Sequence, residues 1–315
     1  MNENGGLTSR LPLDMKKLYI ISWFDKSTIK HLRLPFSFFL LPVFLFALSQ
    51  SDTINWLNAF IAFAILHFLI FPSSNGYNSF QDKDESSIGG IKHPPKVTKN
   101  LYYATLLMDV AGVVFSLLIS VSFSILVLIF ILVSRAYSYR KLRLKKYAVI
   151  GFLTVFIFQG AFVYLMTSMA ITSISLENFI SLNNVICMTI ASLFIGSMYP
   201  LTQIYQHEAD KKDGVISISY KLGYIGTFIF SAILFSLATL LLFYYFNVKH
   251  QQIDLALFII MMLPVIYQLT VWFNKVLIST THANFENTMT MNILTSVCMN
   301  GFFVILILIN YWPLF

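Results

Sequence analysis

Charged residues are scarce in this chain of 315 residues. They make up 11% of it, whereas about 25% is usual for a soluble domain. Hydrophobic residues account for 57%, and the mean hydropathy is +0.74. A water-soluble fold of this length has too little interior to hide so much apolar surface. The composition therefore excludes a soluble enzyme, a disordered chain and a nucleic-acid-binding domain.

Several common functional motifs are also missing. The chain has two cysteines, Cys187 and Cys298, both within apolar runs, so we expect no disulfide framework and no cysteine metal site. The six histidines are scattered, and none pairs at a spacing that suits zinc or haem. There is no phosphate-binding loop of the Walker type. The first 33 residues have no early apolar core, so we expect no cleavable signal peptide.

Nine long apolar stretches dominate the chain instead. A helix needs about 20 mostly apolar residues to cross the hydrocarbon core of a bilayer, and these stretches lack the strict alternation of barrel strands. They cover roughly residues 34–50, 54–73, 101–119, 121–137, 147–168, 180–205, 223–246, 252–273 and 290–312. The sequence therefore predicts an all-α, polytopic membrane protein. We expect a cytoplasmic N-terminal segment over residues 1–33 and a single transmembrane domain over residues 34–315.

Lysine and arginine lie almost entirely on one side of the predicted spans. The N-terminal segment holds six of them, the loops after the second, fourth, sixth and eighth spans hold four, six, three and one, and the opposite loops hold only Lys249. The positive-inside rule then places the N-terminus in the cytoplasm and the C-terminus outside. We expect the protein to be integral to the cell inner membrane. The net charge of +7 is thus a topology signal and does not indicate a nucleic-acid partner.

Six of the 14 acidic residues fall into two short clusters on the predicted cytoplasmic side. The clusters are Asp82, Asp84 and Glu85 after the second span, and Glu208, Asp210 and Asp213 after the sixth. In each cluster an amide precedes an aspartate by four residues, with Asn78 before Asp82 and Gln206 before Asp210. This spacing puts both side chains on one helix face. Mg²⁺ takes such oxygen ligands, usually one or two carboxylates together with substrate phosphates. The matched clusters favour a metal–diphosphate site over ordinary solvated loops.

Basic residues near these clusters would neutralise the remaining charge of a diphosphate. They are Arg140, Lys141, Arg143, Lys145 and Lys146 after the fourth span, and Lys83, Lys211 and Lys212 within the clusters themselves. Asp109 differs from the other acids because it is the one carboxylate well inside a predicted span, where a charge is costly and commonly functional. We consider two roles for Asp109. It either positions or deprotonates an acceptor, or it makes a structural hydrogen bond to a neighbouring helix.

Four stretches of the sequence carry a family resemblance. They are Arg33-Leu-Pro35, Asn78 to Glu85 with Gly89-Gly90 and Pro94-Pro95 after it, Tyr137 to Lys145, and Gln203 to Gly214. Together with nine spans, this pattern resembles the UbiA superfamily of intramembrane prenyltransferases, from about Arg33 to Asn310. The resemblance implies nine transmembrane helices around a central cavity with a cytoplasmic-side cap. It also implies Mg²⁺-dependent transfer of a prenyl group from a polyprenyl diphosphate to a lipophilic, often aromatic, acceptor.

The resemblance also assigns roles to individual residues. Asn78, Asp82, Gln206 and Asp210 correspond to metal or diphosphate ligands, and Arg143 and Lys145 to diphosphate contacts. Ser86 stands where the first motif often has a further acid, and Gln206 stands where the second motif often begins with aspartate. Asp84, Glu85, Glu208 and Asp213 are candidates to supply the missing metal ligands. We predict Asp82, Asp210 and Asp109 as catalytic residues, with Arg140 and Lys211 as further diphosphate-binding residues.

Two other functions would use the same features. An intramembrane terpene cyclase would ionise the same diphosphate but would need no acceptor. A prenyl-lipid binding or transport protein that has lost catalysis would be consistent with Ser86 and Gln206. Against transport, no predicted span carries the chain of ionisable residues that a coupled proton pathway needs.

Overall fold

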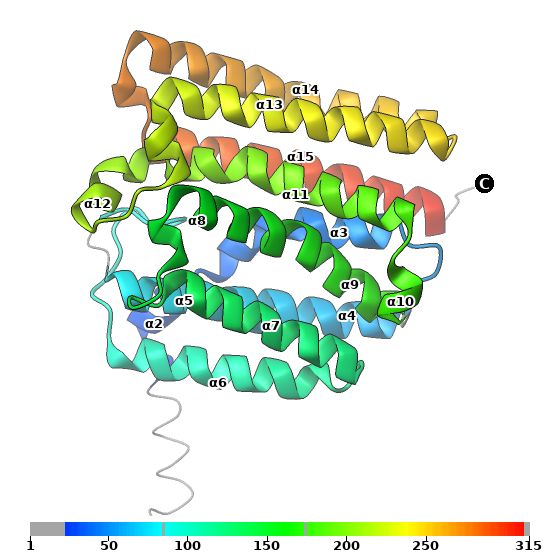
Figure 1. The fold of residues 1–315 in the computed structure, drawn as a ribbon, viewed down its shortest axis with the longest axis horizontal. Helices are drawn as coiled ribbons and strands as arrows, with labels where there is room; N and C mark the ends of the chain where they lie inside the picture. Colours follow the sequence, from blue (N-terminus) through cyan, green and yellow to red (C-terminus); the bar gives the residue numbers. More distant parts are fainter. Residues whose placement is uncertain (1–22, 84–85, 173–174, 312–315) are drawn as a thin grey trace, which may run out of the picture.

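The computed structural model describes residues 23–83, 86–172 and 175–311. The prediction of an all-α protein is confirmed, because the secondary structure of these residues consists of helices with one isolated β-bridge between Ile88 and Ile91. The long helices lie side by side along a common axis (Figure 1).

The helices fall into two consecutive sets along the chain. The first set is α2 (Lys26–Leu32), η1 (Leu34–Phe39), α3 (Leu41–Ser49), α4 (Trp56–Ala64), η2 (Ile65–Ile70), α5 (Phe71–Asp82), α6 (Lys99–Ser116) and α7 (Val121–Ser138). The second set is η3 (Leu144–Lys146), α8 (Ala148–Val155), η4 (Phe156–Ala161), α9 (Phe162–Thr172), α10 (Leu176–Phe179), α11 (Leu182–Gln203), η5 (Ile204–Gln206), α12 (His207–Lys212), α13 (Ile218–Val248), α14 (Gln252–Ile278), η6 (Thr280–His282) and α15 (Phe285–Tyr311).

Eight helical stretches are long and apolar enough to cross a membrane. They are Lys26–Ser49, Trp56–Asp82, Val121–Ser138, Ala148–Thr172, Leu182–Lys212, Ile218–Val248, Gln252–Ile278 and Phe285–Tyr311. The remaining predicted span corresponds to α6, a helix of 18 residues that packs against α5 and α7 but is not one of the eight. Eight of the nine predicted spans are therefore supported, and the ninth span and the cytoplasmic cap stay predictions.

Large apolar side chains cover the outside of the helices. Leu57 and Phe60 in α4, Leu118 in the turn after α6 and Ile253 in α14 are each between 68% and 78% exposed. Water would not tolerate so much exposed apolar surface, whereas lipid tails suit it. The protein is accordingly an integral membrane protein.

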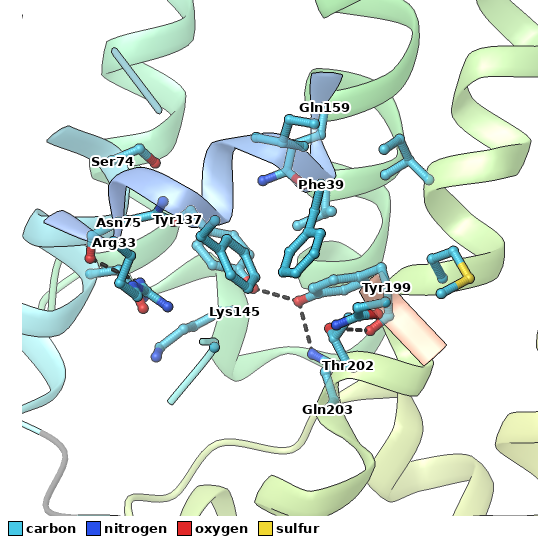
Figure 2. A pocket seen from close by; sticks show the side chains of 18 of the residues that line it. Arg33, Phe39, Ser74, Asn75, Tyr137, Lys145, Gln159, Tyr199, Thr202 and Gln203 are labelled. Carbon is cyan, nitrogen blue, oxygen red and sulfur yellow. Dashed lines mark hydrogen bonds between the residues drawn. The ribbon is translucent and has the colours of Figure 1, made fainter. Parts of the chain in front are cut away.

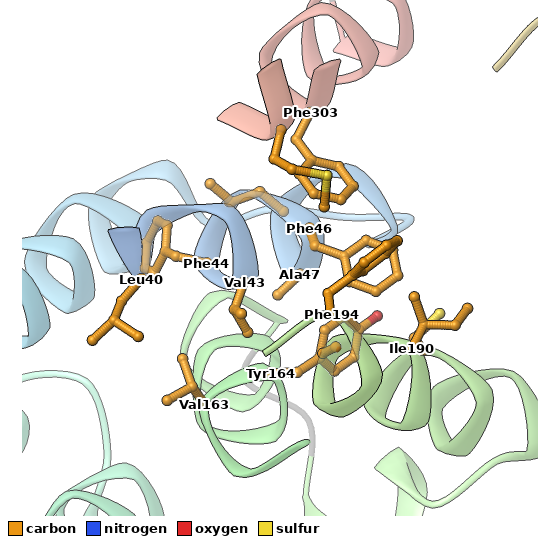
Figure 3. Packing of buried hydrophobic residues seen from close by; sticks show 14 of the residues in the cluster. Leu40, Val43, Phe44, Phe46, Ala47, Val163, Tyr164, Ile190, Phe194 and Phe303 are labelled. Carbon is orange, nitrogen blue, oxygen red and sulfur yellow. The ribbon is translucent and has the colours of Figure 1, made fainter. Parts of the chain in front are cut away.

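Aromatic rings and close helix contacts fill the interior. The ring of Phe46 in α3 lies 5.1 Å from the ring of Tyr164 in α9 and 5.0 Å from that of Phe303 in α15 (Figure 3). Where η4 meets α11, a Cβ atom on Gly160 would lie 2.4 Å from the Cα atom of Ser192, so this approach requires glycine. Because lipid tails are as apolar as these side chains, close packing rather than transfer out of water holds the helices together.

Two π-helical turns place polar side chains inside the bundle. In η2, Nδ1 of buried His67 is 2.5 Å from Oγ of Ser37, which ties this turn to η1. In η4, Gln159 lines the cavity described below. A π turn shifts the register of a helix and is frequent at functional sites.

A buried ion pair lies between α6 and α7. Nε of Arg135 donates to Oδ2 of Asp109 at 2.8 Å, and Oγ of Ser73 in α5 donates to Oδ1 of the same carboxylate at 2.6 Å. The charge count above assigns Arg135 to a loop, and this is wrong because the residue lies inside α7. Of the two roles considered for Asp109, the geometry shows the bond to a neighbouring helix.

Candidate active site

A cavity of about 300 Å³ opens among the helices. Its polar lining includes Asp82 at the end of α5 and Asp210 in α12, and α12 lies at one end of the bundle (Figure 1). Its apolar lining includes Phe46 and Phe303, which lie deep in the bundle (Figure 3). The cavity therefore joins a charged end to an aromatic interior.

Six of the residues predicted for the site line this cavity. They are Asn78, Asp82, Lys145, Gln206, Asp210 and Asp213. The first motif was expected in a loop, but α5 continues to Asp82, so Asn78 and Asp82 lie one turn apart on a helix. In the second motif, Gln206 ends the 3₁₀ turn η5 and Asp210 lies in α12. Residues of both motifs therefore line one cavity.

The amide of each motif is held by its nitrogen. Nδ2 of Asn78 donates to Oγ of Ser138 at 3.1 Å, and Nε2 of Gln206 donates to Oη of Tyr205 at 3.2 Å. These bonds fix the two amides without using their carbonyl oxygens. The oxygen is the amide atom that binds a hard cation.

The loop between α7 and α8 connects the two motifs. One guanidinium nitrogen of Arg143 lies 3.0 Å from Oδ1 of Asp82 and also binds the carboxylate of Asp213. Nζ of Lys145 binds Asp82 as well. Burial opposes ionisation of Asp213, but the hydrogen bond from Arg143 and the charges of Arg143, Arg140 and Lys145 outweigh it and hold the pKa of Asp213 below its ordinary value. This end of the cavity therefore presents interleaved carboxylates and cations.

The other predicted residues either do not line the cavity themselves or lie outside the described residues. Arg140, Arg143, Glu208, Lys211 and Asp109 are described but do not line the cavity, and Asp84 and Glu85 lie outside the described residues. Arg140 is half exposed and donates through Nε to the backbone oxygen of Gln81 at 2.6 Å. The roles assigned to these residues stay predictions.

Several polar residues of the cavity were not predicted. Oη of Tyr137 and Oη of Tyr199 are hydrogen-bonded to each other, and Nε2 of Gln203 donates to Oη of Tyr199 at 2.8 Å (Figure 2). Asn292 and Thr295 in α15 also line the cavity. Tyr137 and Gln203 lie within stretches that carry the family resemblance. For Asn292 and Thr295, the available signal was a polar side chain inside an apolar span.

The oxygen atoms at the charged end suit a metal ion that binds both protein and substrate phosphate better than a metal ion held by protein ligands alone. Among the described residues, no cluster of three or more histidine, cysteine, aspartate or glutamate side chains could hold a metal ion. A hard divalent cation that also binds phosphate oxygens needs only one or two protein carboxylates. Asp82 and Asp210, with the amide oxygens of Asn78 and Gln206, supply such an oxygen-only set.

Comparison with known proteins places this fold and cavity in a family. The model of the UbiA prenyltransferase family matches residues 36–294, and the chain belongs to this family. No curated protein matches the chain.

Solved structures share the fold at low sequence identity. A UbiA homologue from Archaeoglobus fulgidus bound to DMAPP and Mg²⁺ is 14% identical, with a TM-score of 0.63 over 90% of this chain and 99% of that one. The homologue bound to GPP and Mg²⁺ is 15% identical, with a TM-score of 0.61 over the same shares. A structure described for digeranylgeranylglyceryl phosphate synthase is 19% identical, with a TM-score of 0.55 over 90% of this chain and 97% of that one. At these identities the likeness concerns the fold alone.

Proposed function

We propose that this protein transfers a prenyl group from a polyprenyl diphosphate to a small lipophilic acceptor. The reaction would use a Mg²⁺-dependent site at the charged end of the cavity. The observation that carries the proposal is that Asp82 and Asp210, from two matched motifs far apart in the chain, line one cavity whose other end is aromatic. Family membership and the A. fulgidus structures bound to prenyl diphosphates and Mg²⁺ support it.

The charged end is suited to a diphosphate. Asp82, Asp210 and the amide oxygens of Asn78 and Gln206 would hold Mg²⁺, which supplies Lewis-acid stabilisation to the leaving group when it is bound. Lys145 lines the cavity and offers an ammonium group to the phosphate oxygens. Asp82 forms an ion pair with Lys145 in the structure. When substrate enters, Asp82 would bind Mg²⁺ instead, and the ammonium group of Lys145 would turn to the phosphate oxygens.

The transfer step breaks the bond between C1 of the prenyl chain and the diphosphate oxygen, and the diphosphate leaves with the electron pair. A nucleophilic atom of the acceptor forms the new bond to C1 and loses a proton, which the departing diphosphate can accept. The rings of Phe39, Tyr137 and Tyr199 line the same cavity as Lys145 (Figure 2). Each ring face can stabilise a neighbouring allylic cation by about 0.5–2 kcal/mol. The phenylalanines deeper in the cavity would house the prenyl tail and exclude water.

The test incubates purified protein with geranyl diphosphate and an aromatic acceptor such as 1-naphthol, with Mg²⁺ or with a chelator, and measures the release of diphosphate. We expect release and a prenylated product only with Mg²⁺. Asp82→Asn and Asp210→Asn should each reduce turnover about 100-fold or more, since changes to the partners of metal ligands already cost about 10–100-fold. Glu286→Gln is the matched control, because Glu286 is an exposed acid that does not line the cavity.

The outcomes separate the other functions considered. Product formed from the diphosphate alone, with no acceptor added, would show a terpene cyclase. Tight binding of the diphosphate without turnover under any divalent metal would show a binding or transport protein. Full turnover by both aspartate variants would overturn the assigned site.

A further inference from the structure

Helix α12, which carries Asp210, is too short to hold its own position. It has six residues, whereas helices below about 12–15 residues are only marginally stable in isolation. Among these six residues, His207 is the buried one, and its exposed fraction is 6%. His207 does not line the cavity. The position of α12 therefore depends on what the side chain of His207 contacts.

Two aromatic rings near the start of α13 enclose the imidazole ring of His207. The ring of Tyr224 stacks on it, with 4.8 Å between the ring centroids and 18° between the planes. The ring of Tyr220 meets it edge-on, with 5.6 Å between the centroids. Stacked and edge-to-face arrangements are the favourable geometries for such rings. One side chain thus packs α12 onto α13.

A chain of hydrogen bonds fixes the same imidazole. Oγ1 of Thr227 donates to the backbone oxygen of Gly223 at 2.7 Å, which commits the proton of this hydroxyl. Oγ of Ser219 therefore donates to Oγ1 of Thr227, at 3.0 Å. With its own proton committed, Oγ of Ser219 accepts from Nε2 of His207 at 2.8 Å. The network thereby places the proton of His207 on Nε2 and orients the ring.

This network ends on the backbone of α13 at a kink. Gly223 interrupts the helix with φ 70° and ψ 177°, and the backbone oxygen of Ser219, one turn earlier, lies 3.2 Å from Oγ1 of Thr227. Ser219 and Thr227 are both fully buried. A buried polar network whose members are all paired holds one arrangement rigidly. His207 is therefore attached to a fixed point of α13.

His207 lies between the two proposed metal ligands of the second motif. Gln206 directly precedes it, and Asp210 follows three residues later, about 60° around the helix axis. While His207 faces α13, Gln206 and Asp210 line the cavity. Beyond the other end of α12, Arg143 binds the carboxylate of Asp213. Asp210 thus lies between two points at which this short helix is held.

The positions of these ligands matter because Mg²⁺ demands near-ideal octahedral geometry with short bonds to oxygen. Groups that orient metal ligands without touching the ion influence metal affinity strongly. We propose that His207 is a positioning residue for the second motif. Through Ser219 and Tyr224 it holds α12 against α13, and so sets where Gln206 and Asp210 present their oxygen atoms. This inference rests on the proposed function, since it concerns the metal ligands of that site.

The experiment measures metal binding without turnover. It uses the full chain in nanodiscs with geranyl S-thiolodiphosphate, a donor analogue that reacts poorly, and with Mn²⁺, which suits the same oxygen ligands as Mg²⁺. The electron paramagnetic resonance signal of free Mn²⁺ reports its binding. His207→Leu should weaken the binding of Mn²⁺ about 10–100-fold, as expected when a group that orients metal ligands is lost. His207→Gln should recover most of this loss, because its amide nitrogen can donate to Ser219.

A second variant removes the hydrogen bond and leaves the aromatic contacts in place. Ser219→Ala should weaken the binding of Mn²⁺ about tenfold, the lower end of the same range. Adding it to His207→Leu should cause no further loss, because both changes remove the same bond. If His207→Leu does not fold, Ser219→Ala decides the inference.

His67 offers a matched control in a similar environment. Its Nδ1 atom lies 2.5 Å from Oγ of Ser37, and the ring of Phe63 stacks on it at 4.7 Å. His67 is buried in η2, which carries neither acidic motif, and it does not line the cavity. His67→Leu should lower the Tm but leave the affinity for Mn²⁺ unchanged, which is the result expected of a purely structural histidine.

Unchanged Mn²⁺ affinity in a folded His207→Leu or Ser219→Ala variant would overturn the inference. An equal loss of affinity in His67→Leu, or no recovery in His207→Gln, would overturn it as well. Failure of the proposed function is recognised separately, as a wild-type protein that binds Mn²⁺ with the analogue but releases no diphosphate from geranyl diphosphate. The Mn²⁺ affinities of the variants would still decide the inference in that case.

Discussion

Arg143 joins Asp82 of the first acidic motif to Asp213 of the second. One of its guanidinium nitrogens is 3.0 Å from Oδ1 of Asp82 and also binds the carboxylate of Asp213. The two motifs are 131 positions apart between these aspartates, as the numbering shows. A cation from a third segment therefore sets their relative position, and the basic loop aligns the site in addition to supplying positive charge.

The first prediction concerns this bridge. Arg143→Met should destabilise the protein by about 3–5 kcal/mol, because it leaves the buried carboxylate of Asp82 with one fewer cation. Arg140→Met is the control, since Arg140 is half exposed and its pair with Asp213 should contribute only about 0–1 kcal/mol. Thermal unfolding in detergent measures both. Equal shifts of Tm for the two variants would contradict the bridging role.

A second prediction concerns the buried pair of Asp109 and Arg135. Asp109→Asn should destabilise the protein by about 3–5 kcal/mol, because it leaves Arg135 as an uncompensated charge between helices. The double variant Asp109→Leu with Arg135→Met should recover most of this loss, since replacing both partners by apolar groups is often neutral or better. Unfolding measurements on the single and double variants test this. No recovery in the double variant would count against a structural pair, and loss of turnover in a stable double variant would support the catalytic role predicted from sequence.

A third prediction concerns the contact between η4 and α11. Gly160→Ala should destabilise the protein by about 1–3 kcal/mol or more, because its Cβ atom would lie 2.4 Å from the Cα atom of Ser192. The control is Gly301→Ala, whose Cβ atom meets only the flexible end of Met261 at 3.1 Å. The comparison of Tm values is decisive, and a Gly160→Ala variant as stable as Gly301→Ala would disprove the close approach.

A fourth prediction concerns the aromatic end of the cavity. Phe303→Ala should shift donor preference toward longer prenyl diphosphates, because it removes a ring that lines the cavity and stacks on Phe46. Competition between ten-carbon and twenty-carbon donors measures the ratio of their kcat/KM values. We expect this ratio to change about tenfold, the lower end of what one methylene group in a hydrophobic pocket contributes. Phe302→Ala is the control, because Phe302 is buried beside Phe303 without lining the cavity. An equal change of donor preference in Phe302→Ala would mean that the effect comes from looser helix packing in general and not from the cavity.

The sequence predicted the fold, because the fold follows from local patterns, and it singled out the two motifs that the structure places in one cavity. Apolar stretches define the helices, and the four-residue spacing of Asn78 and Asp82 survives in the structure as one turn of α5. In the second motif, by contrast, Gln206 lies in η5 and Asp210 in α12. The pairing of Arg143 with Asp82 and Asp213 could not be predicted, since it depends on how three distant segments meet. Arg135 was misplaced for a similar reason. Its position near the end of a span resembles that of a loop cation, and only the fold shows that Asp109 lies opposite.

Two polar residues of the cavity lining illustrate the same limit. Asn292 and Thr295 stand in an apolar span with no spacing that sets them apart from helix-packing residues. Only the structure shows that they line the cavity and that Nδ2 of Asn292 and Oγ1 of Thr295 have no hydrogen-bond partner among the described residues.

The central claim is that prenyl transfer takes place where the two acidic motifs meet. It is tested most directly by adding isotopically labelled geranyl diphosphate and Mg²⁺ to membranes that contain either the wild-type protein or the Asp82→Asn variant, and by searching for labelled products by mass spectrometry. The account predicts a product that carries the labelled prenyl group on an acceptor in wild-type membranes and at least about 100 times less of it with the variant. The same product formed in equal amounts by the variant would contradict the account.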